Sequence, residues 1–203
     1  MESMELQTSN GQRPGELLRM VSINEDIKVV MRIAKEINLT AINAMLISNK
    51  IGSSGFGVVS SELRIFSRRL NEVMHSLLEC VSMLVREVAG MIRLDKAMQV
   101  QQATQARAPH YTYWDAMRMR KASELKRNHA SVECFRLKLA LAVNKANKLC
   151  VMGRSLSYSA KVEAVYGGEQ ANALKQVSEQ VEGAICGILG TLAKLDRQLG
   201  MAA

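Results

Sequence analysis

The chain has few of the residues that build β-sheet proteins or membrane spans. Aromatic residues make up 4% of its 203 residues, and its two prolines are Pro14 and Pro109. Sheet sandwiches and barrels need aromatic and β-branched runs that are separated by frequent turns. No run of 18 apolar residues occurs, so we expect no transmembrane segment. These absences favour a helical protein.

Residue patterns typical of catalysis or metal binding are also scarce. The four cysteines are scattered, and none has a second cysteine or a histidine at a zinc-ligand spacing. The three histidines are isolated, and the glycine-rich stretch at residues 52–57 lacks the Lys-Ser/Thr pair of phosphate-binding loops. We therefore expect no enzyme activity, no cofactor and no metal. The cysteines fit buried thiols in a reducing cytoplasm, which is the expected location.

The formal net charge of +8 raises the question of a nucleic-acid or acidic-membrane partner. The basic residues are spread along the chain, and the densest cluster lies between Arg118 and Arg127. A solvated helix face is the simpler interpretation of such a cluster. Because no recognition-helix motif and no series of stacking aromatics is present, nucleic-acid binding ranks last among the functions considered, and we expect no nucleic-acid partner.

The residues that are abundant favour long helices with a heptad seam. Apolar or small residues recur from Ile23 to Ile51 at spacings that alternate between four and three, as in a coiled coil. Similar patterns predict helices from residue 14 or 23 to 51, and over 56–105, 113–165 and 169–199. Helices of this length that are joined by short turns predict an all-α fold, an elongated antiparallel four-helix bundle built from two helical hairpins.

An internal repeat relates the two hairpins. The seam of residues 23–51 overlays residues 139–167 with a shift of 116, and the seam of 59–77 overlays 177–195 with a shift of 118. Apart from Thr191, every overlaid position is apolar or small. The expected organisation is a flexible leader, a single helical bundle made of two pseudo-repeat hairpins, and a projecting helical arm. The leader comprises residues 1–13 and the bundle comprises residues 14–203. Within the bundle, the two hairpins are 14–82 and 130–200, and the arm is 83–129.

The arm at 83–129 carries apolar residues that a lone two-helix hairpin cannot bury on both faces. One interpretation is that the arm binds a partner, for example a second copy of the chain in a homodimer. The alternative is that the arm folds back or that the N-terminal leader covers it. The residues concerned are Leu84, Val88, Met91, Leu94, Met98, Trp114, Met117 and Leu125.

A family resemblance lies in the first hairpin, where residues 33–70 read IAKEINLTAINAMLISNKIGSSGFGVVSSELRIFSRRL. The alanines and asparagines before the glycine turn and the Gly-Phe-x-Val-Val arm after it resemble the signalling tip of methyl-accepting chemotaxis proteins. Residues 162–170, VEAVYGGEQ, resemble the same turn in the second hairpin. The resemblance implies that the tip contacts the chemotaxis histidine kinase or its coupling adaptor. The implied contact residues are Leu39, Ile42, Asn43, Leu46, Val58, Val59 and Glu62.

The first turn also departs from the family pattern. It is two residues shorter, and Ile47, Lys50 and Ser54 replace a Glu and two Arg that help to hold receptor dimers together in trimers. Two hypotheses therefore stay open beside the nucleic-acid one. The first is a receptor-like cytoplasmic signalling protein that binds the kinase or adaptor through its tip. The second is a divergent scaffold that has lost kinase control and binds partners through the 83–129 arm.

Overall fold

The computed structural model describes residues 5–51, 54–105, 113–166 and 171–199, and they form long helices. The helices are α1 (Glu5–Ile51), α2 (Ser54–Gln105), α3 (Tyr113–Val165) and α4 (Ala171–Gln198). No strand occurs in these ranges. The all-α expectation is therefore confirmed, and the observed ends of α2 and α3 lie within two residues of the expected ones.

The start of α1 differs from the sequence-based expectation. We expected a flexible leader at residues 1–13, whereas residues 5–13 are already part of α1. The segment is polar, but Glu, Gln and Arg are good helix formers, so its polarity does not prevent helix formation. Pro14 lies inside this helix, where it removes a single backbone donor.

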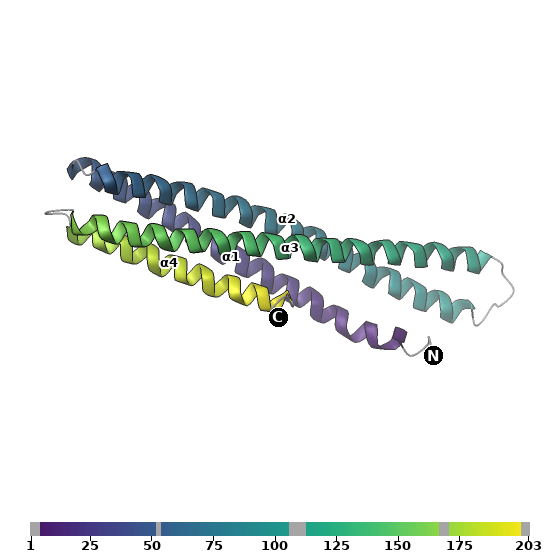
Figure 1. Ribbon diagram of the computed structural model, residues 1–203. Helices are drawn as coiled ribbons and strands as arrows, with labels where there is room; N and C mark the ends of the chain where they lie inside the picture. Colours follow the sequence, from purple (N-terminus) through teal and green to yellow (C-terminus); the bar gives the residue numbers. More distant parts are fainter. Residues whose placement is uncertain (1–4, 52–53, 106–112, 167–170, 200–203) are drawn as a thin grey trace. The chain divides into compact units, whose positions relative to one another are not determined.

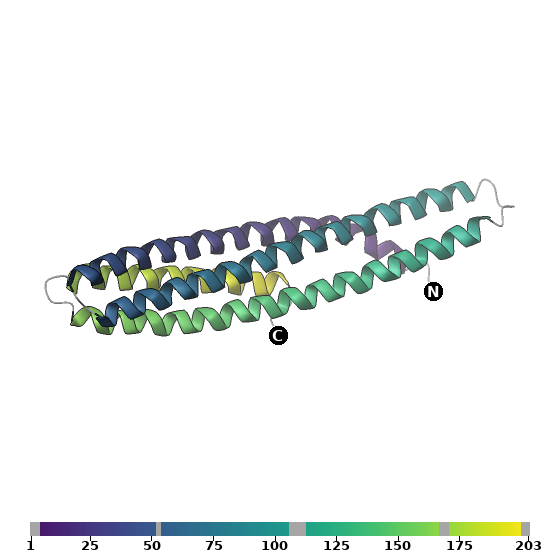
Figure 2. The same ribbon diagram turned by 90° about the horizontal axis from the view of Figure 1, so that it is seen from above.

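The chain divides into two compact units, and we name each by its content. The bundle unit comprises Ile23–Leu78 and Ala140–Ala203, and the arm unit comprises Met1–Ser22 and Glu79–Leu139. The bundle unit therefore contains parts of all four helices. In both Figure 1 and Figure 2, α1 and α3 end, and α2 and α4 begin, at the same end of this unit. The two hairpins thus point the same way, and we call that end the tip.

The core of the bundle unit follows the expected heptads closely on three helices. In α1, every seam position from Ile23 to Ser48 is buried, and the overlaid positions of α3 in this unit, from Val143 to Ala164, are buried as well. The α2 seam is buried from Phe56 to Leu77. The two counterpart helices α1 and α3 thus bury the same register, which supports the internal repeat.

The α4 seam differs from the expectation at two positions. Ala184 and Thr191 were expected in the core but are half-buried, whereas Ile185 and Leu192 are buried. Their α2 counterparts Ser67 and Met74, obtained with the shift of 118, are buried too. The repeat therefore holds, and the larger side chain of each adjacent pair in α4 takes the core position because it removes more apolar surface from water.

Small residues let the helices of the bundle unit approach closely. A β-carbon built at Gly153 would lie 2.8 Å from Cζ of Phe66 and 3.1 Å from Cδ1 of Ile185. Phe66 thus occupies the space that a side chain on α3 would need. Buried serines occur at matching repeat positions: Ser60 Oγ donates to the Phe56 carbonyl at 2.8 Å, and Ser178 Oγ donates to the Leu174 carbonyl at 2.9 Å. Both hydroxyls are thereby satisfied within their own helices.

The arm unit buries part of the apolar surface that we expected to be exposed. Leu84, Val88 and Met91 of α2 are at most 3% exposed, and Met20 of α1 is also buried. The N-terminal part of α1 belongs to the same unit as the two arm helices. Met20 follows the expected leader at 1–13, whose side chains lie outside the described ones, so the alternative in which the leader covers the arm stays a prediction. Leu94, Met98, Met117 and Leu125 are half-buried, and Trp114 lies outside the residues whose side chains are described.

Candidate docking surface

The outer side of α1 near the tip carries three apolar side chains that point away from the core. Leu39 and Leu46 are 60% and 58% exposed, and Ile42 between them is half-buried. Spacings of three and four residues place all three on one side of the helix. Asn43 is exposed beside Ile42. The sequence-predicted residues of α1 therefore form a strip with exposed ends and a half-buried centre at Ile42.

The start of α2 adds two predicted residues to the surface of the bundle unit. Val58 is 63% exposed, and Glu62 one turn later is exposed as well. A β-carbon at Gly57 would lie 3.3 Å from Oγ of Ser48, so α1 and α2 pack closely at this level. These exposed residues and the half-buried Ile42 form what we call the tip face: Leu39, Ile42, Asn43, Leu46, Val58 and Glu62.

Val59 is the predicted contact residue that does not belong to this surface. It is 8% exposed and lies in the α2 seam with Leu63 and Phe66. Adjacent residues on a helix point about 100° apart, so Val58 and Val59 cannot both face outward. The pair of valines therefore divides into one surface residue and one core residue.

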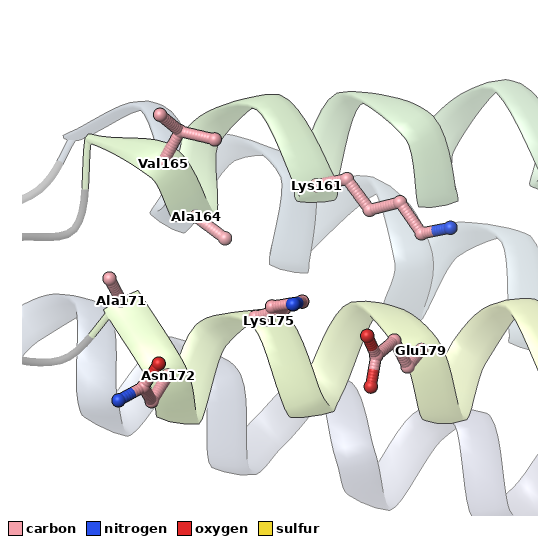
Figure 3. Close-up of a pocket in the computed structure, with 7 residues that line it drawn as sticks. All are labelled: Lys161, Ala164, Val165, Ala171, Asn172, Lys175 and Glu179. Atoms are coloured by element: carbon pink, nitrogen blue, oxygen red, sulfur yellow. The ribbon is translucent and has the colours of Figure 1, made fainter.

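A groove lies near the tip in the second hairpin. It has a volume of about 390 Å³ and is lined by the end of α3 and the start of α4. Figure 3 shows that the Ala164 methyl points from α3 toward α4, with Lys175 and Glu179 on the facing helix. Lys161 Nζ donates to Glu182 Oε2 across the same pair of helices, and this hydrogen bond raises the pKa of Lys161. The groove is thus flanked by charged groups over an apolar floor.

The two hairpins meet at the tip through Glu163 and Gly55. A β-carbon at Gly55 would collide with the Glu163 carboxylate, so the end of that side chain lies directly on the α2 backbone. Gly55 is in the first turn of α2, where free N–H groups and the helix dipole favour a negative charge. Glu163, from the VEAVYGGEQ segment, therefore stabilises the start of the helix that carries Val58.

The sequence interpretation missed exposed apolar residues on α3. Tyr158, Val162 and Val165 are each at least half exposed. Tyr158 and Val162 are the repeat counterparts of Ile42 and Leu46. The internal repeat could therefore have predicted Tyr158 and Val162, because the shift of 116 residues relates the outer faces of the two helices as well as their seams.

Two further features of the described residues bear on the kind of site that the chain offers. Within these ranges, no group of three or more His, Cys, Asp or Glu side chains is placed to hold a metal ion. None of the described helices combines the length and apolarity that crossing a bilayer requires. No protein-family model, curated protein or solved structure matches this chain.

Proposed function

We propose that this chain is a receptor-like cytoplasmic signalling protein that docks the chemotaxis histidine kinase or its coupling adaptor on the tip face. The observation that carries the proposal is the strip of exposed Leu39 and Leu46, with half-buried Ile42 between them, within the segment that resembles the chemoreceptor tip. An apolar strip on a packed helix suits partners that bind by side-chain insertion into a groove. Binding, and not catalysis, is the proposed activity.

The arm is the weaker candidate for the partner site. Its seam residues Leu84, Val88 and Met91 are buried, and its exposed apolar residues Met83, Val100 and Met119 lie outside the segment that resembles the chemoreceptor tip. In contrast, the core does not bury Leu39, Leu46 and Val58 of the tip face. The tip face therefore remains exposed after the bundle unit has formed its core, which favours receptor-like docking over the scaffold hypothesis.

The test is a binding titration of the full chain with the purified kinase and with the purified coupling adaptor of its own organism. Ile42→Glu introduces a charge into the centre of the strip, and we expect it to weaken binding at least about tenfold, as for central interface residues. The matched control is Tyr158→Glu, which makes the equivalent change at the repeat-related position. We expect the control to bind like the unmodified chain.

Circular dichroism of both variants checks that the bundle is intact. Tyr158 is half exposed and Ile42 lies off the buried seam, so we expect neither variant to lose helix content. Equal binding by the unmodified chain and Ile42→Glu would remove the tip face from the interaction. An absence of binding to both the kinase and the adaptor would refute the proposed function itself.

A further inference from the structure

The outward side of α3 in the bundle unit carries a second heptad stripe, opposite the buried seam. Its positions alternate at spacings of three and four residues, and five of the eight are apolar and at least half exposed. At 1.5 Å per residue the stripe is about 36 Å long. We call it the outer α3 stripe, and it comprises Leu141, Asn144, Lys148, Val151, Ser155, Tyr158, Val162 and Val165.

The internal repeat shows that this stripe is not a by-product of the bundle. Subtracting the shift of 116 gives the corresponding surface of α1, which begins with four charged residues: Glu25, Lys28, Arg32 and Lys35. The buried seams of the two helices match, so both surfaces are compatible with the same core. Leu141 is 70% exposed where its counterpart is Glu25, and Val151 is 62% exposed where its counterpart is Lys35. The core therefore gives no reason for apolar side chains at these two α3 positions.

The geometry of the stripe matches a helical partner. A seam of two positions per heptad is the surface that one helix presents to another in a coiled coil. A membrane-surface helix instead needs a broad apolar face that enters the headgroup region. Asn144, Lys148 and Ser155 interrupt the outer α3 stripe, and α3 is held in a bundle by its opposite side. A single helix laid along α3 accounts for a narrow and interrupted stripe.

The charges beside the stripe indicate the chemistry of that helix. Residues 140–165 contain four basic residues and one acidic residue, and the acidic one is Glu163, whose carboxylate lies against Gly55. Lys161 Nζ is 5.7 Å from the centre of the Tyr158 ring, and Arg154 shares a hydrogen bond with Tyr158. In the groove beside the stripe, Lys161 is paired with Glu182 and Lys175 lies near Glu179, so the basic excess comes from Lys145, Lys148 and Arg154 of α3. Two copies of a basic surface would repel, whereas an acidic helix would be attracted.

We propose that the outer α3 stripe docks an amphipathic helix of a partner protein, with apolar residues at its heptad seam and acidic residues at the flanking positions. This site is distinct from the tip face and does not depend on the proposed function. Each hairpin would then present its own surface to its own partner.

The test uses two synthetic helical peptides as probes, each about four heptads long and with identical Leu and Ile seams. One peptide has Glu at both flanking positions and the other has Lys. We expect the full chain to bind the Glu peptide at least about tenfold more tightly than the Lys peptide, with a preference that shrinks at high salt. Val151→Glu should weaken binding of the Glu peptide at least about tenfold. Ile42→Glu on the tip face should leave it unchanged.

Several results would overturn the proposal. Equal binding of the two peptides, no binding of either, or unchanged binding by Val151→Glu would each do so. Sedimentation of the chain alone checks for a second copy: a dimer that Val151→Glu dissociates would assign the stripe to self-association. Vesicles of phosphatidylcholine and phosphatidylserine check for a membrane, and binding that Val151→Glu abolishes would assign it to a lipid surface.

Discussion

Gly153 gives the sharpest test of how the bundle unit is packed. Replacing it with alanine would place a methyl group 2.8 Å from Cζ and 2.9 Å from Cε2 of Phe66. Real β-carbons essentially never approach so closely, so Phe66 or the α3 backbone must move. Phe66 is 4% exposed, and Cδ1 of Ile185 would lie 3.1 Å from the same β-carbon, so both neighbours crowd the new methyl group. The substitution therefore overpacks the core.

Two opposing effects set the size of the change. Overpacking a close-packed core costs about 1–3 kcal/mol, and replacing a helical glycine with alanine contributes about 0.5–1 kcal/mol in favour of the helix. We expect Gly153→Ala to lower the free energy of unfolding by about 1 kcal/mol net. For a chain of this size, such a change lowers the melting temperature by about 2–4 °C. Helix content measured by circular dichroism during thermal unfolding reports the shift.

Gly183→Ala is the matched control for this experiment. Gly183 is also helical, but a β-carbon there would have no atom of the chain within 4 Å, so we expect a gain of about 0.5–1 kcal/mol. A second variant, Gly153→Ala with Phe66→Leu, removes the clashing ring, and we expect it to be more stable than the sum of the single changes by at least about 0.5 kcal/mol. The reasoning is refuted if Gly153→Ala stabilises the chain as Gly183→Ala does.

Two further predictions concern buried chemistry in the bundle unit. Burial raises the pKa of the Cys150 thiol to about 12. At pH 8 we therefore expect iodoacetamide to modify the exposed Cys186 quickly and Cys150 only on unfolding. Equal rates of modification of the two thiols would contradict the burial of Cys150. Because the folded pKa is raised, the stability associated with this thiol is complete below its ordinary pKa of about 8.5 and is lost as the pH rises toward 12, a loss that Cys150→Ala should not show. Lys194 Nζ lies 2.8 Å from Oδ1 of Asp26, whose side chain is 13% exposed, so Lys194→Met should lower the free energy of unfolding by about 1 kcal/mol in urea titrations. In an Asp26→Asn background the same change should have almost no effect, and an undiminished loss there would show that the ion pair is not its cause.

The sequence predicts the helices and most of the core because both depend on local periodicity. The α1 seam from Ile23 to Ser48 repeats every 3.5 residues, and a helix with this repeat buries one side wherever it finds partners. The exchange of Ala184 for Ile185 in α4 was not predictable in this way. Adjacent positions both lie near the seam, and the choice between them depends on which space the facing helices fill, as Phe66 fills the space beside Gly153.

The sequence predicted only part of the candidate site, because it does not give the direction of every side chain. The motif segment identified the exposed residues Leu39, Leu46 and Val58, because those positions lie off the seam. Val59 was included among the contact residues because the motif contains it, although the heptad pattern already placed it in the α2 seam, where it is buried. The helical N-terminal residues 5–13 were missed because their helix belongs to the arm unit, whose partner segments are more than fifty residues away in the sequence.

The presence of both hairpins in one polypeptide has a consequence for how the bundle responds to dilution. Two separate hairpins would come apart as their concentration falls, whereas covalently linked ones experience a fixed local concentration on the order of millimolar. The bundle should therefore form at any level of expression. The linkage also allows the two hairpins to differ in sequence. A homodimer must repeat every surface change on both subunits, whereas here the charged Lys35 and the apolar Val151 occupy equivalent positions. One chain can thus carry an asymmetric assembly that a symmetric dimer cannot form.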